Sequence, residues 1–185
     1  MPKKNVIGEA KYPDIDDGRK KFADTKPHFH NGTDSPLVDV RNAKRLGVLT
    51  KHSVAVTTGV QTVSNTATWT AVTFLTEVFD PTSNHSTIIN TSRIQPTEGG
   101  IWEVHGYIDW EADTTGIRGL ALYKNGAVVT EYWNRADGSG NVSNVLVWVI
   151  SLTSADYIEL YAYQSSGGGL DIDNGLFSAK LLGYV

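Results

Sequence analysis

Alternating apolar and polar residues dominate the chain from Val54 onward. The clearest case is the segment 101–111, where the residues on one side are Trp102, Val104, Gly106, Ile108 and Trp110. The intervening positions hold Glu103, His105, Tyr107 and Asp109. A period of two is that of a β-strand with one buried face. We therefore predict a strand here, with its tryptophan-bearing face in a core.

Further strands are predicted on both sides of this segment. The strand-prone segments are 54–60, 69–79, 117–124, 127–133, 142–152, 157–163 and 176–185. Asn125-Gly126 is a strong hairpin signal because both positions tolerate a positive φ. The segments 165–169 and 171–175 are rich in Ser, Gly, Asp and Asn, so we expect turns there. Short strands with turns between them predict an all-β fold, an antiparallel sandwich or jelly roll.

The segment 142–152 is apolar on both faces. Leu146, Trp148 and Ile150 fall on one side, and the other side holds Val145, Val147 and Val149. A strand with two apolar faces lies either inside a sandwich or at a subunit interface. We therefore assign the three valines, together with Tyr161 and Tyr163 of a later strand, to the core or to a subunit interface.

Residues 1–50 show no sustained periodicity and are punctuated by Pro13, Pro27 and Pro36. A short helical turn is expected at 38–46, with Asp34 or Ser35 as its cap. We expect an extended N-terminal arm at 1–50 and a folded head at 51–185. This division suits a chain of 185 residues, because single domains most often have about 100 to 150.

Charge is distributed unevenly between these two parts. Residues 1–51 hold 11 Lys and Arg against 7 Asp and Glu, a net charge of +4, and the remainder has a net charge of −8. This asymmetry indicates either a solvated basic linker or an arm that docks on an acidic surface. Nucleic acid is not an expected partner, because aspartates interrupt the basic residues and no stacking aromatics alternate with them.

The sequence contains no cysteine, so it offers neither disulfides nor thiol chemistry. Residues 1–9 have no apolar run behind Lys3 and Lys4, so we expect no secretory signal. No segment approaches the ~18 apolar residues of a membrane span, and no membrane partner is expected.

Three strings in the last third of the chain form a recognisable set. They read LALYKNG at 120–126, DYIELYAYQ at 156–164 and FSAKLL at 177–182. The set resembles the globular heads of complement C1q and the related tumour necrosis factor (TNF) jelly rolls. The resemblance spans about 69–185, where FDP at 79–81 and GGIW at 99–102 are similar to further family corners. Ala179 stands where the family usually has Gly, and Ser-Ala-Asp at 154–156 replaces its common Gly-Asp turn. The resemblance implies a trimeric C1q/TNF-like jelly roll that serves in binding or assembly.

His28 and His30 lie in the string PHFHNGTDSP at 27–36. In an extended segment, residues two apart face the same side, so both imidazoles can approach one ion. Three chains would supply about six nitrogens on a trimer axis, enough for iron, nickel or zinc. The string is also similar to the His-x-His segments of bacteriophage fibres and spikes. The alternative is a pair of exposed histidines before an Asn-Gly turn.

Other candidate ligands are dispersed. We expect His105 to be a wall or interface residue, His85 a loop residue, and His52 isolated in sequence. Asp171, Asp173 and Asn174 offer calcium-type oxygens, but without the spacing of a calcium loop, so a polar turn is the expected state. The sequence has no Gly-x-Ser-x-Gly elbow, phosphate-binding glycine loop or His-Glu-x-x-His motif, so we do not expect an enzyme.

These features together predict a non-enzymatic structural protein of a bacteriophage virion, assembled in the host cytoplasm. It would be a homotrimeric fibre, tail-tip or capsid decoration protein, with the arm at 1–50 bound to other virion proteins and the head free for host-surface glycan or protein. Two alternatives stay open. A secreted complement-type ligand would carry a signal or a collagen stalk, and a carbohydrate-binding module would be a monomer with an aromatic platform such as Trp133 or Tyr132.

Overall fold

The computed structural model describes residues 53–65, 68–137, 139–140 and 142–185. The chain divides into two units, Met1–Val38 and Asp39–Val185, and all described residues belong to the second. The predicted arm at 1–50, its helical turn at 38–46 and the histidines His28, His30 and His52 lie outside the described residues.

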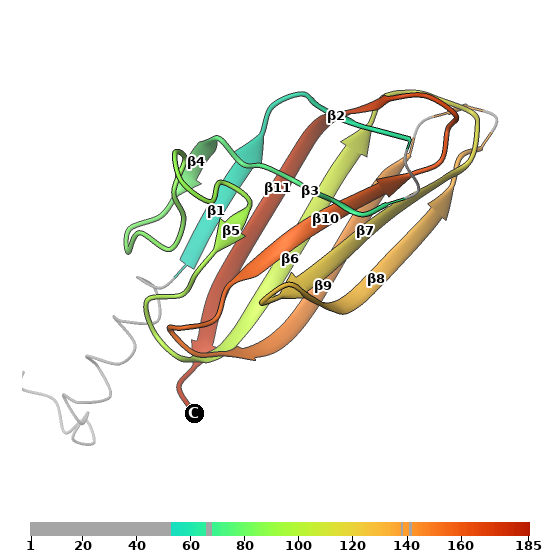
Figure 1. Cartoon of the computed structure of the whole chain (residues 1–185). Helices are drawn as coiled ribbons and strands as arrows, with labels where there is room; N and C mark the ends of the chain where they lie inside the picture. The colour runs from blue at the N-terminus through green and yellow to red at the C-terminus, as the bar shows by residue number, and fades with distance from the viewer. Residues whose placement is uncertain (1–52, 66–67, 138, 141) are drawn as a thin grey trace, which may run out of the picture. The chain divides into compact units, whose positions relative to one another are not determined.

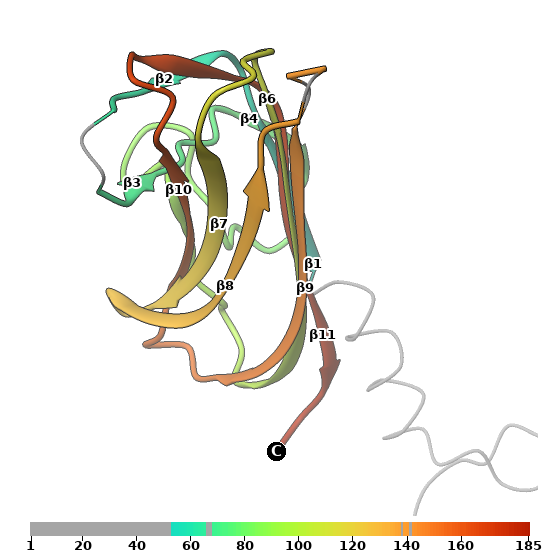
Figure 2. The same cartoon turned by 90° about the vertical axis from the view of Figure 1, so that its right-hand side faces the viewer.

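The head is built from two antiparallel sheets that face each other (Figure 2). The first sheet has the order β4-β1-β11-β6-β9, with β2 also paired to β11 (Figure 1). Its strands are β1 (Ser53–Thr58), β2 (Gln61–Val63), β4 (Thr76–Phe79), β6 (Gly100–Trp110), β9 (Ser143–Leu152) and β11 (Leu170–Gly183). The expected all-β jelly roll is confirmed. The described residues contain no helix, and so none that could cross a membrane.

The second sheet has the order β3-β10-β7-β8, with β5 also paired to β10. Its strands are β3 (Thr70–Ala71), β5 (Arg93–Ile94), β7 (Ile117–Lys124), β8 (Ala127–Arg135) and β10 (Ile158–Gln164). We call the side of each sheet that faces away from the other sheet its outer face.

The core fills the space between the sheets. Trp102 and Ile108 of β6 face Leu120, Leu122 and Leu160 of the second sheet, and all five are fully buried. A Cβ on Gly106 would lie 2.9 Å from the Leu160 methyl carbons, so glycine lets the sheets approach at this point. The predicted inward face of the segment 101–111 is thus confirmed by the alternating burial of β6.

One end of the core accommodates a buried cation. The Arg118 guanidinium is fully buried and donates hydrogen bonds to the carbonyl oxygens of Thr115 at 2.9 Å and Ile117 at 3.2 Å. Burial lowers the pKa of Arg118, while Asp113 opposes that effect. These contacts tie the loop before β7 to the core and give Arg118 a structural role.

The Asn125-Gly126 hairpin forms as predicted. Both residues have a positive φ, 52° and 79°, and β7 and β8 pair on either side of them. The Asn125 amide donates a 2.6 Å hydrogen bond to Asp156, which joins this hairpin to the turn before β10.

Two details of the predicted strand pattern were wrong. The segment 171–175 is not a turn, because it pairs with β2 and β6 as the first part of β11 and absorbs an irregularity between Ile172 and Asn174. The single segment predicted at 69–79 is instead two short strands, β3 and β4, which belong to different sheets.

Candidate functional site

The outer face of the first sheet carries a column of exposed valines on β9. Val145, Val147 and Val149 are 55%, 55% and 54% exposed. Their cross-strand partners on β6 are Tyr107, His105 and Glu103, in that order. A continuous apolar column on a solvent-facing strand is typical of a surface that a protein partner covers.

The remainder of this face is more polar. His105 Nε2 lies 2.7 Å from Glu103 Oε1 beside the valines, on the side away from the core, and an interface role for His105 stays a prediction. The Tyr107 hydroxyl donates a hydrogen bond to Asp109, and this bond raises the pKa of Tyr107. The valines give this surface an apolar contact area, and the polar groups beside them can fix the orientation of a bound partner.

A second exposed apolar group lies where β9 runs beside β8. Trp148 is on the core side of β9, opposite Val104, yet 42% of it is exposed. Its neighbours on that side, Leu146 and Ile150, are buried or packed against the core. Trp148 therefore marks an incompletely covered edge of the sandwich, distinct from the valine column.

The outer face of the second sheet carries aromatic residues. We define the aromatic strip as the side chains of Trp69, Tyr123, Trp133, Tyr157, Tyr161 and Tyr163. Three of them cluster at one end, with the Trp69 ring centroid 4.9 Å from that of Trp133 and 5.6 Å from that of Tyr163. Tyr123 and Tyr161 stack at 4.1 Å in the middle. At the other end, the Arg93 guanidinium lies 3.9 Å from the Tyr157 ring centroid.

Close packing fixes these rings. A Cβ on Gly119 would lie 2.8 Å from the Trp69 ring and 2.9 Å from the Trp133 ring, so the indoles rest on the β7 backbone. Desolvation raises the pKa of both Tyr123 and Tyr161. Trp133 is nevertheless 41% exposed, and its indole N–H donates to Glu131 Oε2 at 3.1 Å. The strip is an ordered surface that remains open to solvent.

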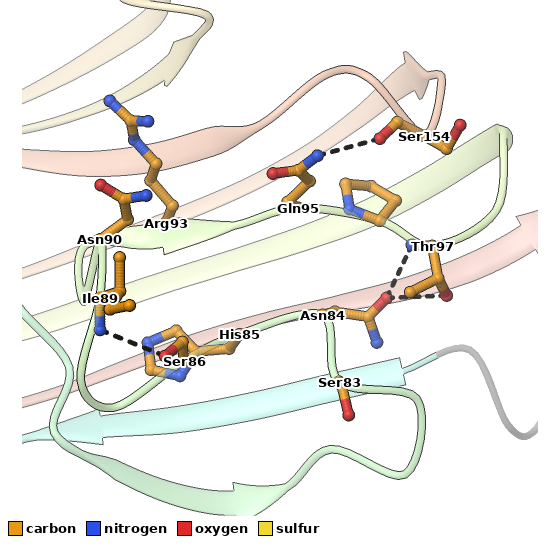
Figure 3. A pocket seen from close by; sticks show the side chains of 11 residues that line it. Ser83, Asn84, His85, Ser86, Ile89, Asn90, Arg93, Gln95, Thr97 and Ser154 are labelled. Carbon is orange, nitrogen blue, oxygen red and sulfur yellow. Dashed lines mark hydrogen bonds between the residues drawn. The ribbon is translucent and has the colours of Figure 1, made fainter.

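A polar pocket of about 530 Å³ is lined by residues of the segment 83–97, which connects β4 to β6 and contains β5, and by Ser154 (Figure 3). Its two buried polar side chains are already engaged in the loop. The Asn84 amide donates to Asp80 and Thr82 and accepts from the Thr97 backbone N–H. His85 Nε2 lies 3.1 Å from the Thr91 carbonyl oxygen. These residues brace the loop, so His85 has the loop location predicted for it together with a structural role.

The structure separates the five residues assigned to a core or an interface. The three valines lie on the outer face of the first sheet. Tyr161 and Tyr163 lie half-buried in the aromatic strip of the second sheet, outside the core cluster. An interface role for these residues stays a prediction, but the valines and the tyrosines cannot share one flat surface.

The candidate calcium residues lie on a strand and not in the predicted turn. Asp171, Asp173 and Asn174 belong to strand β11. Within the described part of the chain, no group of three or more His, Cys, Asp or Glu side chains could hold a metal ion.

Sequence reasoning missed the aromatic strip and the pocket. Trp133 was considered as a platform, but its partners Trp69 and Tyr123 were not. The sequence does not show which side of the segment 117–124 faces the core, because both sides are apolar. One side holds Leu120 and Leu122, and the other holds Ala121 and Tyr123.

Comparisons with known proteins bear on the fold alone. No family model and no curated protein matches the sequence. Among solved structures, the globular domain of zebrafish complement 1qA is 18% identical, with a TM-score of 0.53, and the match covers 73% of this chain and 100% of that one. Murine APRIL at pH 5.0 is 17% identical, with a TM-score of 0.55 and coverages of 71% and 100%.

A third similar structure comes from an insect. Eiger TNF from S. frugiperda is 14% identical, with a TM-score of 0.52, and the match covers 72% of this chain and 95% of that one. The two-sheet, all-β topology of the described residues is consistent with these similarities. The head of this protein has the jelly-roll fold of the C1q and TNF-like heads.

Proposed function

We propose that the protein is a non-enzymatic, homotrimeric binding module that associates through its first sheet. The valine column carries this proposal, because three adjacent valines are each more than half exposed in a single head. Covering the exposed part of each would contribute about 1 kcal/mol before association costs.

Two distinct apolar surfaces favour a ring of chains over a two-fold dimer. The valine column lies on a sheet face, and Trp148 lies at the edge between β8 and β9. An edge that contacts a different surface of the neighbouring chain makes a heterologous interface, and such an interface closes into a ring when its rotation divides a full turn evenly. The resemblance to C1q and TNF-like heads implies that the ring has three members.

We further propose that the protein is a component of a virion. It rests on the basic arm, on the His-x-His string at 28–30 and on the similarity of that string to phage fibre segments. In this account, residues 1–50 bind other virion proteins, and the head is displayed for a host-surface glycan or protein. An arm that lacks an independent core becomes ordered on its partner.

A secreted complement-type ligand is the second candidate. The similarities to complement 1qA, APRIL and Eiger support this candidate better than they support a virion protein. Both candidates share the trimeric, non-enzymatic head, and they differ in where the protein is found and in what the arm does.

Fractionation separates the two candidates. An antibody against the head is used to probe gradient-purified particles from the producing culture and the particle-free medium. The virion account predicts the protein in the particles. Protein found only in the particle-free medium would contradict that account and support the secreted ligand.

Deleting residues 2–50 tests the role of the arm. The described core lies wholly within 54–181, so we expect the shortened chain to keep β-type circular dichroism while losing particle association. Undiminished association of the shortened chain would contradict attachment through the arm.

A further inference from the structure

The aromatic strip occupies positions that the fold does not need for its core. On β7 and β10, the inward positions Leu120, Leu122 and Leu160 are fully buried between the sheets. The aromatic residues of these strands alternate with them and face outward. Large aromatic groups gathered on a solvent-facing sheet indicate a ligand surface.

The strip is pre-organised for contact with a ligand. Trp69, Trp133 and Tyr163 hold one another at centroid distances of 4.9 to 5.6 Å, and Gly119 provides the space beneath the indoles. A ligand that stacks on fixed rings therefore incurs little additional loss of side-chain entropy.

Charge on this face is balanced. Arg93 pairs with Glu159 at 3.1 Å. Glu131 and Arg135 lie on the same side of β8 as Trp133, because residues two apart in a strand share a face. Two cations and two carboxylates give a formal charge of zero on a head whose net charge is otherwise strongly negative. The strip therefore suits an uncharged ligand and does not attract polyanions.

The polar groups beside the rings select among uncharged ligands. The phenol groups of the strip both donate and accept hydrogen bonds, whereas the Glu131 carboxylate only accepts them, so a ligand that bonds to Glu131 must supply donors. A sugar ring presents an apolar C–H face with hydroxyl donors around its rim. A proline-rich peptide also stacks on aromatic rings, but its prolines have no N–H to donate.

We propose that the aromatic strip on the outer face of the second sheet binds a neutral oligosaccharide. From Tyr157, just before β10, to Tyr163 within it, the extended chain spans about 20 Å, which accommodates several consecutive sugar units. The sugar faces stack on the aromatic rings, and their hydroxyls bond to the carboxylate and phenol oxygens. The inference rests on the proposed display of the head for binding, and it names the class of ligand.

Calorimetric titration of the full-length protein provides the test. The probes are neutral hexasaccharides of glucose, mannose and N-acetylglucosamine, with hexagalacturonate and a proline decapeptide for comparison. We expect at least one neutral hexasaccharide to bind, with an affinity that changes less than about twofold between 50 mM and 500 mM salt. Binding of none of the neutral probes at millimolar concentration, or of hexagalacturonate or the proline peptide alone, would overturn the proposal.

Two neighbouring substitutions locate the site. Trp133→Ala is expected to weaken binding at least about tenfold, because it removes a central stacking ring. Tyr132→Ala is the matched control, since Tyr132 is 45% exposed on the same strand but pairs with Leu120 and points to the opposite side. Equal affinity of Trp133→Ala and the unaltered protein would refute the site.

A second variant and two separate measurements keep the test interpretable. If Trp133→Ala does not fold, Tyr123→Ala opens the stacked pair in the middle of the strip, and the same loss of affinity is expected. Chain number and particle association are measured independently. Failure of sugar binding is thereby distinguished from failure of the trimer or of the virion location.

Discussion

Asp156 is the residue on which the end of the β7–β8 hairpin depends. Its carboxylate accepts hydrogen bonds from the Asn125 amide at 2.6 Å and from the Thr153 backbone N–H at 2.8 Å. Lys124 Nζ approaches to 3.1 Å. The Thr153 and Asn125 hydrogen bonds hold the pKa of Asp156 well below its ordinary value of 3.8.

We predict that Asp156→Asn lowers the free energy of unfolding by about 1 to 2 kcal/mol at pH 7, because an amide cannot accept all of these bonds. Since the folded-state pKa is depressed, the stabilisation is present above the unfolded-state pKa and is lost as the pH falls below about 3.8. Urea unfolding at pH 7 and pH 3 measures both effects. Asp173→Asn, at an exposed position of β11, is the control, and equal stability of the two variants at pH 7 would contradict the assignment.

His28 and His30 remain a proposed metal site. If the paired imidazoles of three chains surround one transition metal, elemental analysis of untagged protein should find about one metal ion for every three chains. His28→Ala with His30→Ala should remove the metal and lower the melting temperature, because metal binding stabilises the folded assembly. The metal site would be contradicted if the unaltered protein contained no metal and the double substitution left its melting temperature unchanged.

At the scale of the element, the long strands could be predicted and the short ones could not. β6 has eleven residues of strict alternation, and β7 ends at an Asn-Gly turn, so local sequence determines both. β3 and β5 have two residues each and arise from pairing with β10, which no local period reveals. The start of β11 looked like a turn because Asp, Asn and Gly are turn residues, but pairing on both sides overrides that preference.

The candidate sites, like the short strands, depend on packing that the local sequence does not reveal. The apolar character of both sides of β9 could be predicted, but the sequence left open whether its valines lie in the core or at an interface, and it did not show which side is exposed. The aromatic strip depends on which face of β7 and β10 is inward, and packing against β6 decides that. The sequence therefore assigns Tyr161 and Tyr163 to the core or an interface, but it does not show that they lie on the outer face of the second sheet.

We predict that Gly119→Ala destabilises the head by about 1 to 3 kcal/mol, because its Cβ would displace the Trp69 and Trp133 rings. Near-ultraviolet circular dichroism should change with the rings, and thermal unfolding measures the loss. Gly168→Ala is the control, since no atom lies within 4 Å of the added Cβ. Unchanged ring signals in Gly119→Ala would contradict the packing described for the strip.

At the scale of the whole molecule, the two outer faces have different proposed partners. We propose that the valine column of the first sheet contacts other copies of the chain and that the aromatic strip of the second sheet contacts a glycan. This division follows from the sandwich, because two sheets that share one core must present their outer faces in opposite directions. Assembly through the first sheet leaves the strip exposed on the outside of the ring.

Central to this account is assembly into a trimer through the valine column, and light scattering of the full-length protein tests it most directly. We predict a mass of three chains of 20.2 kDa, about 61 kDa, at micromolar concentration. Val147→Glu should yield folded single chains, whereas Val128→Glu, at a 51% exposed valine of the second sheet, should leave the trimer intact. A single-chain mass for the unaltered protein, or a trimer that withstands Val147→Glu, would contradict the account.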